Sequence, residues 1–225
     1  MKILALETAA DPGSVALWCD GAVTARACPA ELSNSAALLP AAQEILAEQG
    51  LSFADLDGLA FGAGPGSFTG LRVACGVAQG LAFGRDIPLL SIGTLEAMAL
   101  ESGGERVLVA LDARMGEVYC ACYVAGQLQG EVGVYPPEAL PLPQGEGWLA
   151  CGNALVAYPV LRERLAPHVA EWRPEIMPSA AGVVRLAAPR LERGEAIDPA
   201  LAAPLYVRDK VAKTVAERLA EGGKA

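Results

Sequence analysis

The sequence of 225 residues predicts an α/β protein of two lobes, each with a mixed sheet flanked by helices. The chain opens on three strand-like segments before its first helix, and a similar order of strands follows residue 103. Hydrophobic residues make up 53% of the chain, which provides a sizeable core and argues against disorder. A chain of this length suits two lobes of roughly 100 residues each.

Residues 1–103 form the expected N-terminal lobe. Asp20-Gly21 is a strong hairpin signal between two of its strands, and Gly50 is a natural stop for the first helix. The elements expected here are strands at 2–7, 14–19 and 22–28, a helix from Ser33 or Ser35 to about 49, a strand at 59–62, a helix at about 71–83, a strand at 88–92 and a helix at 94–102.

Residues 104–225 form the expected C-terminal lobe, after a boundary at Gly103-Gly104. The elements expected here are strands at 106–112, 117–125, 127–135 and 148–152, helices at 155–165 and 179–193, an extended segment at 204–210 and a helix at 211–220. Two successive units of this order indicate the duplicated lobe of the sugar kinase, Hsp70 and actin (ASKHA) fold. The alternative is a single doubly wound sheet, which an opening on hairpin-linked strands suits poorly.

Charge and hydropathy restrict the function classes. The net charge is −9 without a long basic run, whereas a chain that binds nucleic acid alone usually presents a basic face. Any nucleic-acid contact is therefore expected through a partner or a small patch. The apolar N-terminal stretch ends at Glu7, and no segment reaches 18 uncharged apolar residues, so we expect a cytoplasmic protein without membrane contact.

The cysteine and histidine content argues against a metal site. The six cysteines include no C-x-x-C pair, and we expect them to be reduced and to act as small buried apolar residues. The single histidine, His168, excludes a site with two histidines and disfavours zinc chemistry. No intrinsic metal or cofactor is expected.

The most informative stretch is the glycine-rich loop at 62–70, between an expected strand and an expected helix. Its glycines allow close backbone approach, and the N-terminus of the following helix favours an anion. The loop does not match the sequence pattern of a Walker loop, a dinucleotide-binding fingerprint or a nucleophile elbow. A structural turn and a nucleotide or phosphate contact remain as alternatives. The candidates for such a contact are Thr8, Gly64, Pro65, Gly66, Ser67, Phe68, Thr69 and Gly70.

Two helices of the N-terminal lobe are candidates for a partner interface. Gly76, Gly80 and Gly84 recur on one face of the second helix, although each interior glycine costs about 1 kcal/mol relative to alanine. They either pack on the lobe's own sheet or leave a flat face for a helix of another subunit. The first helix is apolar beyond one stripe, so the two helices could form a helix-bundle interface. The interface candidates are Leu38, Leu39, Leu71, Arg72, Gly76 and Gly80.

Four segments of the chain resemble the TsaB family, also called YeaZ. The motif at 64–72 reads GPGSFTGLR, and the others are LALETA at 4–9, DARMGEVY at 112–119 and PLYVRD at 204–209. They occur in the expected order and together form a specific set. Proteins of this family are subunits of the bacterial complex that makes threonylcarbamoyladenosine (t6A) in tRNA.

The resemblance implies the actin-like fold and a set of partners. Family members pair through helices of the N-terminal lobe, as a homodimer alone or as a heterodimer with the catalytic subunit TsaD, and the ATPase TsaE joins them. The complex transfers a threonylcarbamoyl group to the adenosine beside the anticodon of ANN-decoding tRNAs. We therefore expect a non-catalytic scaffold that meets tRNA only indirectly, with ATP or ADP bound, if at all, at the complex interface. The DARMGEVY motif makes Asp112, Arg114, Glu117 and Tyr119 candidates for the inter-lobe cleft or a partner surface.

Two positions separate this chain from the catalytic paralogue. That paralogue carries an H-x-x-x-H pair where this chain has Thr94 and Met98, and neither residue suits a hard metal ion. We expect Thr94 to cap a helix and Met98 to lie in the core. Within the family, Asn34 stands where members commonly have histidine, which could alter local capping but not the function.

Three other function classes stay open. The catalytic transferase, or a metalloprotease-like relative, is disfavoured by the lost histidine pair. A small-molecule kinase of this fold would need an aspartate at the end of its first strand, where the chain has Glu7-Thr8-Ala9, and the chain is short for one. A nucleotide sensor would bind ATP or ADP at the loop without chemistry.

A small basic cluster lies near the C-terminus, at Arg208, Lys210 and Lys213, with Arg218 further along. We expect a solvated helix end here, with contact to tRNA or a partner as the alternative.

Overall fold

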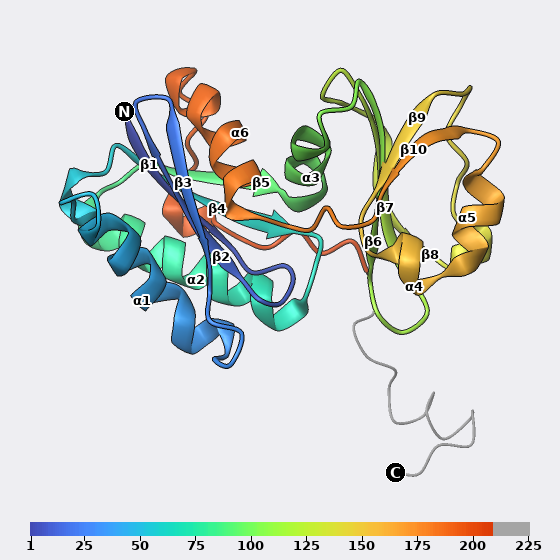
Figure 1. Ribbon diagram of the computed structural model, residues 1–225. Coiled ribbons are helices and arrows are strands. Elements are labelled where there is room, and N and C mark those ends of the chain that lie inside the picture. The colour runs from blue at the N-terminus through green and yellow to red at the C-terminus, as the bar shows by residue number, and fades with distance from the viewer. Residues whose placement is uncertain (209–225) are drawn as a thin grey trace, which may run out of the picture.

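The computed structural model describes residues 1–208 as two sheets with flanking helices (Figure 1). The first part of the chain contains β1 (Lys2–Glu7), β2 (Ser14–Cys19), β3 (Ala22–Ala27), α1 (Asn34–Ala47), β4 (Gly58–Gly64), α2 (Phe68–Arg85), β5 (Leu89–Gly93) and α3 (Thr94–Ser102). The second part contains β6 (Arg106–Asp112), β7 (Val118–Val124), β8 (Gln127–Tyr135), β9 (Trp148–Cys151), α4 (Ala154–Ala157), α5 (Pro159–Leu165), β10 (Val169–Arg173) and α6 (Ala180–Glu192).

The two sheets have the same topology. The strand order is β3-β2-β1-β4-β5 in the first sheet and β8-β7-β6-β9-β10 in the second. In each sheet the first three strands pair antiparallel, and the last two are added in parallel. This duplication confirms the predicted actin-like fold class and excludes the single doubly wound sheet.

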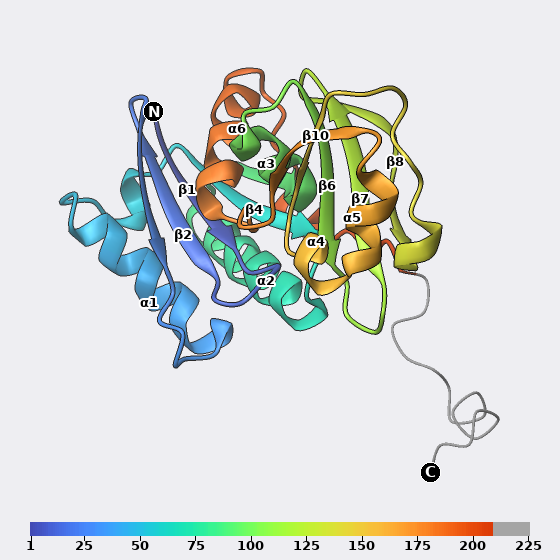
Figure 2. The same ribbon diagram turned by 45° about the vertical axis from the view of Figure 1, so that its right-hand side comes forward.

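Helices cover both faces of the first sheet. Alternating residues of β1 point to opposite faces, as a strand requires. Leu4 and Leu6 join a core cluster with α1 and α2, whereas Ile3 and Ala5 join a cluster with α6. The two views show α1 and α2 side by side on the same face (Figures 1 and 2). Both helices therefore have one buried side and one outward side.

The chain returns to the first sheet after completing the second. α6 packs against β1, β2, β4 and β5, and its cap residue Ser179 accepts a hydrogen bond from the Gly182 amide at 3.2 Å, as predicted. Beyond α6, the Leu205 amide donates to the Ala63 carbonyl oxygen at 2.7 Å. The sequence did not predict this return, and the division of the chain at residue 103 stays a prediction.

Three elements differ clearly from the prediction. α2 begins at Phe68 rather than near 71, because Ser67 serves as its cap. The single helix predicted at 155–165 is wrong, since α4 ends before Pro159 and α5 begins there. Proline has no N–H to continue a helix, but it suits the first helical position. Strand β10 was missed.

Within residues 1–208 no helix is long and apolar enough to cross a membrane. The cysteines there are free; Cys28, Cys75, Cys120 and Cys151 are buried, as predicted, while Cys19 and Cys122 are partly exposed.

Candidate functional site

The end of β1 carries a buried acidic side chain. The Glu7 carboxylate is 1% exposed and accepts hydrogen bonds from the Ala9 amide at 2.7 Å and from the Thr94 hydroxyl at 3.1 Å. The Thr94 oxygen also accepts from the Gly64 amide at 3.1 Å. Thr94 thus connects β1, β4 and α3, and its predicted role as a helix cap is wrong, because Gly93 occupies the cap position.

Burial changes the ionisation of Glu7. Desolvation raises the pKa of this carboxyl group from 4.5 to about 7, although the hydrogen bonds to its charged form oppose the shift. A Cβ atom at position 62 would lie 2.0 Å from Glu7 Oε2, so glycine is required there to accommodate the side chain. The carboxyl group is enclosed by its own lobe and does not line the inter-lobe cleft.

The glycine-rich loop packs tightly against the end of β1. A Cβ atom at position 70 would lie 1.8 Å from the Thr8 carbonyl oxygen, and the Thr8 hydroxyl donates to the Gly70 carbonyl oxygen at 2.6 Å. A Cβ atom at position 66 would lie 2.4 Å from that of Ala9. Contacts within the chain therefore explain these two glycines without a ligand.

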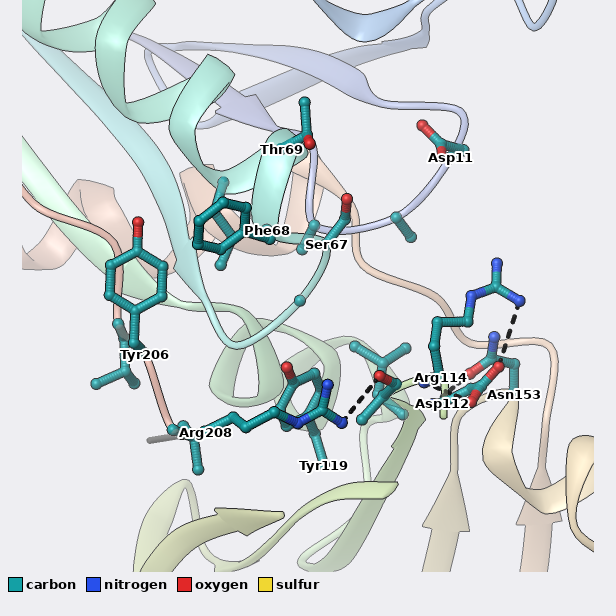
Figure 3. A pocket seen from close by; sticks show the side chains of 18 of the residues that line it. Asp11, Ser67, Phe68, Thr69, Asp112, Arg114, Tyr119, Asn153, Tyr206 and Arg208 are labelled. Atoms are coloured by element: carbon teal, nitrogen blue, oxygen red, sulfur yellow. Dashed lines mark hydrogen bonds and ion pairs between the residues drawn. The ribbon is translucent and has the colours of Figure 1, made fainter. Parts of the chain in front are cut away.

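A cleft of about 410 Å³ lies between the lobes (Figure 3). The start of α2 and the loop after β1 form one wall, and the loop after β6 forms the other, with the segment before residue 208 beside them. The lining residues are Ala9, Ala10, Asp11, Gly66, Ser67, Phe68, Thr69, Leu71, Leu111, Asp112, Ala113, Arg114, Met115, Tyr119, Asn153, Met177, Leu205, Tyr206, Val207 and Arg208.

Only some of the predicted nucleotide-contact residues line the cleft. Gly66, Ser67, Phe68 and Thr69 line it. Ser67 caps α2 by accepting from the Gly70 amide at 3.3 Å. The other candidates, Thr8, Gly64, Pro65 and Gly70, do not line the cleft. The prediction that Thr8 contacts a nucleotide or phosphate is wrong, because Thr8 is completely buried and its hydroxyl donates a hydrogen bond to the backbone.

Three of the four DARMGEVY candidates line the same cleft: Asp112, Arg114 and Tyr119. The Asp112 carboxylate accepts from the Arg114 amide at 2.9 Å, and the Arg114 guanidinium lies 3.5 Å from the same carboxylate (Figure 3). Glu117 does not line the cleft and forms an ion pair with Arg208. The chain therefore brings these charges together but pairs them with one another.

Sequence reasoning missed three residues at or beside the cleft. The Asn153 side-chain oxygen accepts from the Asp112 amide at 2.9 Å, and the short turn that contains Asn153 carries no motif. Tyr158, outside the cleft lining, donates its hydroxyl to the Asp112 carboxylate at 2.8 Å. Tyr206 belongs to the PLYVRD motif, which could have indicated its role.

Arg72 contacts two aromatic side chains beside the cleft. Its guanidinium carbon lies 3.6 Å from the centre of the Phe68 ring and 5.7 Å from that of Tyr206. The Arg72 Nε group donates to the Tyr206 hydroxyl at 2.9 Å. Figure 3 shows Phe68 on α2 and Tyr206 on the neighbouring C-terminal segment. This aromatic–arginine cluster (Phe68, Arg72 and Tyr206) joins residues far apart in sequence.

The interface candidates on α1 and α2 divide by burial. Leu38 is buried in the core of the first lobe and Leu71 is buried beside the cleft, so neither lies on the outward face of the helices. Leu39 is 38% exposed, and Arg72, Gly76 and Gly80 are also exposed. A Cβ atom at Gly76 or Gly80 would have no atom within 4 Å, so packing on the lobe's own sheet does not explain these glycines.

Asn34 holds a loop rather than a helix end. Its side-chain oxygen accepts from the Gly13 amide at 2.9 Å, and its amide group donates to Asp11 at 2.7 Å. Ser33 occupies the cap position of α1 without a side-chain cap bond. The expected effect of Asn34 on capping is therefore wrong, because its side chain is committed to the loop after β1.

Met98 lies in the core, as predicted. In residues 1–208, no three or more His, Cys, Asp or Glu side chains gather to hold a metal ion. Arg208 pairs with Glu117, whereas Lys210, Lys213 and Arg218 lie outside the described residues.

Comparison with known proteins assigns the chain to a family. A family model described as TsaD, tRNA N6-adenosine threonylcarbamoyltransferase, matches residues 29–215. The chain is 38% identical to the tRNA threonylcarbamoyladenosine biosynthesis protein TsaB of Escherichia coli, over 94% of this chain and 96% of that protein. It is 34% identical to the TsaB protein of Haemophilus influenzae, over 94% of this chain and 95% of that protein.

A solved structure agrees with this assignment. YeaZ from Pseudomonas aeruginosa superposes with a TM-score of 0.82 at 35% identity, over 91% of this chain and 99% of that chain. The predicted resemblance is thereby confirmed, and the chain belongs to the TsaB (YeaZ) family.

Proposed function

We propose that this chain is a non-catalytic scaffold subunit of the complex that makes t6A in tRNA. In this proposal it pairs through α1 and α2 with a TsaD-type catalytic subunit, is joined by a TsaE-type ATPase, and forms a homodimer when alone. The nearly full-length similarity to proteins named for t6A biosynthesis supports the pathway. The chain would meet tRNA through the complex, in the cytoplasm.

The outward face of α1 and α2 is the observation that carries the proposal. α1 leaves Leu39 and Pro40 exposed, and α2 exposes Gly76, Gly80 and Phe83, the last at 59%. Interior glycines cost about 1 kcal/mol each relative to alanine, and no contact inside the lobe offsets this cost. Small residues let another backbone approach closely, so the face suits a second pair of helices.

Residue types in the buried part of the first lobe and at the cleft support a non-catalytic role. Thr94 and Met98 stand where the resemblance places the metal-binding histidines of the catalytic paralogue, and both side chains are buried. Glu7 is enclosed, while Asp112 and Arg114 pair with each other. None of these groups offers an unpaired acid, base or nucleophile to a substrate. We infer no intrinsic cofactor, and a nucleotide, ATP or ADP, would require groups from a partner.

The pairing is tested by titrating the purified chain with a TsaD-type subunit from the same organism. Gly76→Leu places a bulky side chain on the open face, where an added Cβ atom would meet no atom within 4 Å, and we expect at least a tenfold weaker affinity. Ala157→Leu, on an exposed helix of the second lobe, is the matched control. Equal binding by both variants would contradict the proposed interface.

A small-molecule kinase or a nucleotide sensor remains the second candidate, favoured by the four loop residues in the cleft. ATP turnover by the purified chain would support the kinase, and ATP binding without turnover would support the sensor. The scaffold proposal expects neither.

A further inference from the structure

We propose that Arg72 is a preorganised anchor for a carboxylate on the partner subunit that docks on α1 and α2. This inference rests on the proposed pairing function and adds the chemistry of one contact. Arg72 belongs to the aromatic–arginine cluster, and it is the one member of that cluster among the interface candidates.

The cluster fixes the arginine before any partner arrives. The guanidinium is stacked on Phe68 at 3.6 Å, and the Tyr206 hydroxyl accepts a hydrogen bond from Nε at 2.9 Å. These contacts hold the plane of the guanidinium, so little side-chain freedom would be lost on binding. A lysine could not reproduce this arrangement, because it lacks the planar group.

Within residues 1–208 the two terminal amino groups of Arg72 have no hydrogen-bond partner. Among residues 1–208, no carboxylate forms an ion pair with Arg72, whereas Arg190 pairs with Glu96 and Arg208 with Glu117. Nε is already used by Tyr206, which leaves the Nη1 and Nη2 edge for a ligand. That edge can grip a carboxylate by two parallel hydrogen bonds.

The position of Arg72 relates it to the proposed interface. Phe68, Arg72, Gly76 and Gly80 follow one another at intervals of four along α2, so they lie in one row on its outward side. Arg72 lies one turn, about 6 Å along the axis, from Gly76. A helix that crosses α2 at the glycines would therefore pass within reach of its side chain.

The charge of the chain favours a protein carboxylate over a nucleic-acid phosphate. The net charge is −9, and binding of nucleic acid depends on several basic contacts acting together. Aromatic residues and arginine are the types enriched at the energetic centres of protein interfaces. Electrostatic pairing at such a point selects the partner and fixes the register of the two surfaces.

The test measures affinity of the full chain for the purified TsaD-type subunit of the same organism. Arg72→Lys keeps the charge and should weaken binding about tenfold, and Arg72→Glu by about a hundredfold or more. Arg162→Lys is the matched control, because Arg162 also stacks on an aromatic ring, Trp172, at 4.9 Å but lies on α5. It should bind within about twofold of the unchanged chain. Melting temperatures show whether each variant is folded.

The outcomes distinguish the anchor from the pairing itself. If the unchanged chain does not bind the partner subunit, both proposals fail. If it binds, Gly76→Leu blocks binding and Arg72→Lys has no effect, then only the anchor is overturned. Unchanged subunit affinity with weaker tRNA binding by the assembled complex would assign Arg72 to a phosphate and would also overturn it. Recovery of Arg72→Glu binding by one Asp→Arg or Glu→Arg change in the partner would identify the carboxylate and support the proposal.

Discussion

Replacing Glu7 by glutamine should change how the stability of the protein depends on pH. Glu7 is enclosed at the end of β1, and burial raises its pKa from 4.5 to about 7. Since one pKa unit corresponds to about 1.4 kcal/mol, ionising Glu7 in the folded state costs about 3 kcal/mol relative to the unfolded chain. Glutamine has nearly the same shape and never carries this charge.

The direction of this pH dependence follows from how many protons Glu7 binds in the folded and in the unfolded state. Between pH 4.5 and about 7 the folded protein keeps the Glu7 proton that the unfolded chain has released. The contribution of Glu7 to the free energy of unfolding is therefore fully present below pH 4.5, and is lost as the pH rises through about 7. From pH 5 to pH 8 the unchanged protein should lose about 2.5 kcal/mol relative to Glu7→Gln.

Urea unfolding of both proteins at pH 5, 6, 7 and 8 measures this difference. Comparing the two proteins at each pH removes the contributions of all other titrating groups. Glu163→Gln, on the exposed side of α5, controls for the loss of one carboxylate. A difference between the unchanged protein and Glu7→Gln that stays constant with pH would refute the raised pKa of the buried Glu7.

Three further substitutions test the packing. Gly70→Ala should destabilise the protein by about 3 kcal/mol, because the new Cβ would lie 1.8 Å from the Thr8 carbonyl oxygen; an unchanged urea midpoint would contradict this. Gly76→Ala should raise the free energy of unfolding by up to about 1 kcal/mol, since its Cβ meets nothing within 4 Å; a loss of stability would show a hidden contact. Ser179→Ala should cost about 1 kcal/mol in the same assay by removing the cap of α6, and a cost near zero would place the cap elsewhere.

Local patterns were sufficient to predict most of the fold. Hairpin turns, apolar strands and cap residues marked nearly every strand of both sheets, and the repeated order revealed the duplication. The features that the sequence did not predict depend on contacts between residues distant in sequence. The return of α6 to the first sheet is decided by packing against β1 and β4, which no local signal announces.

Contacts between residues distant in sequence also decide the structure of the candidate site. The sequence identified the glycine-rich loop, but not that Gly70 is required by the Thr8 carbonyl oxygen, since this contact spans 62 residues. It identified Arg72 as an interface candidate, but the hydrogen bond from Arg72 to the Tyr206 hydroxyl joins residues 134 positions apart. The sequence predicts Thr94 as a helix cap, because neither segment alone indicates the hydrogen bond between Thr94 and Glu7.

The central claim, that this chain supports catalysis by another subunit, is tested most directly by reconstituting the modification reaction. Transfer of the threonylcarbamoyl group to an ANN-decoding tRNA would be measured with the TsaD-type and TsaE-type subunits, with and without this chain. We expect activity only when the chain is present, and none from the chain alone. Full activity in its absence, or modification of tRNA by the chain unaided, would contradict the account.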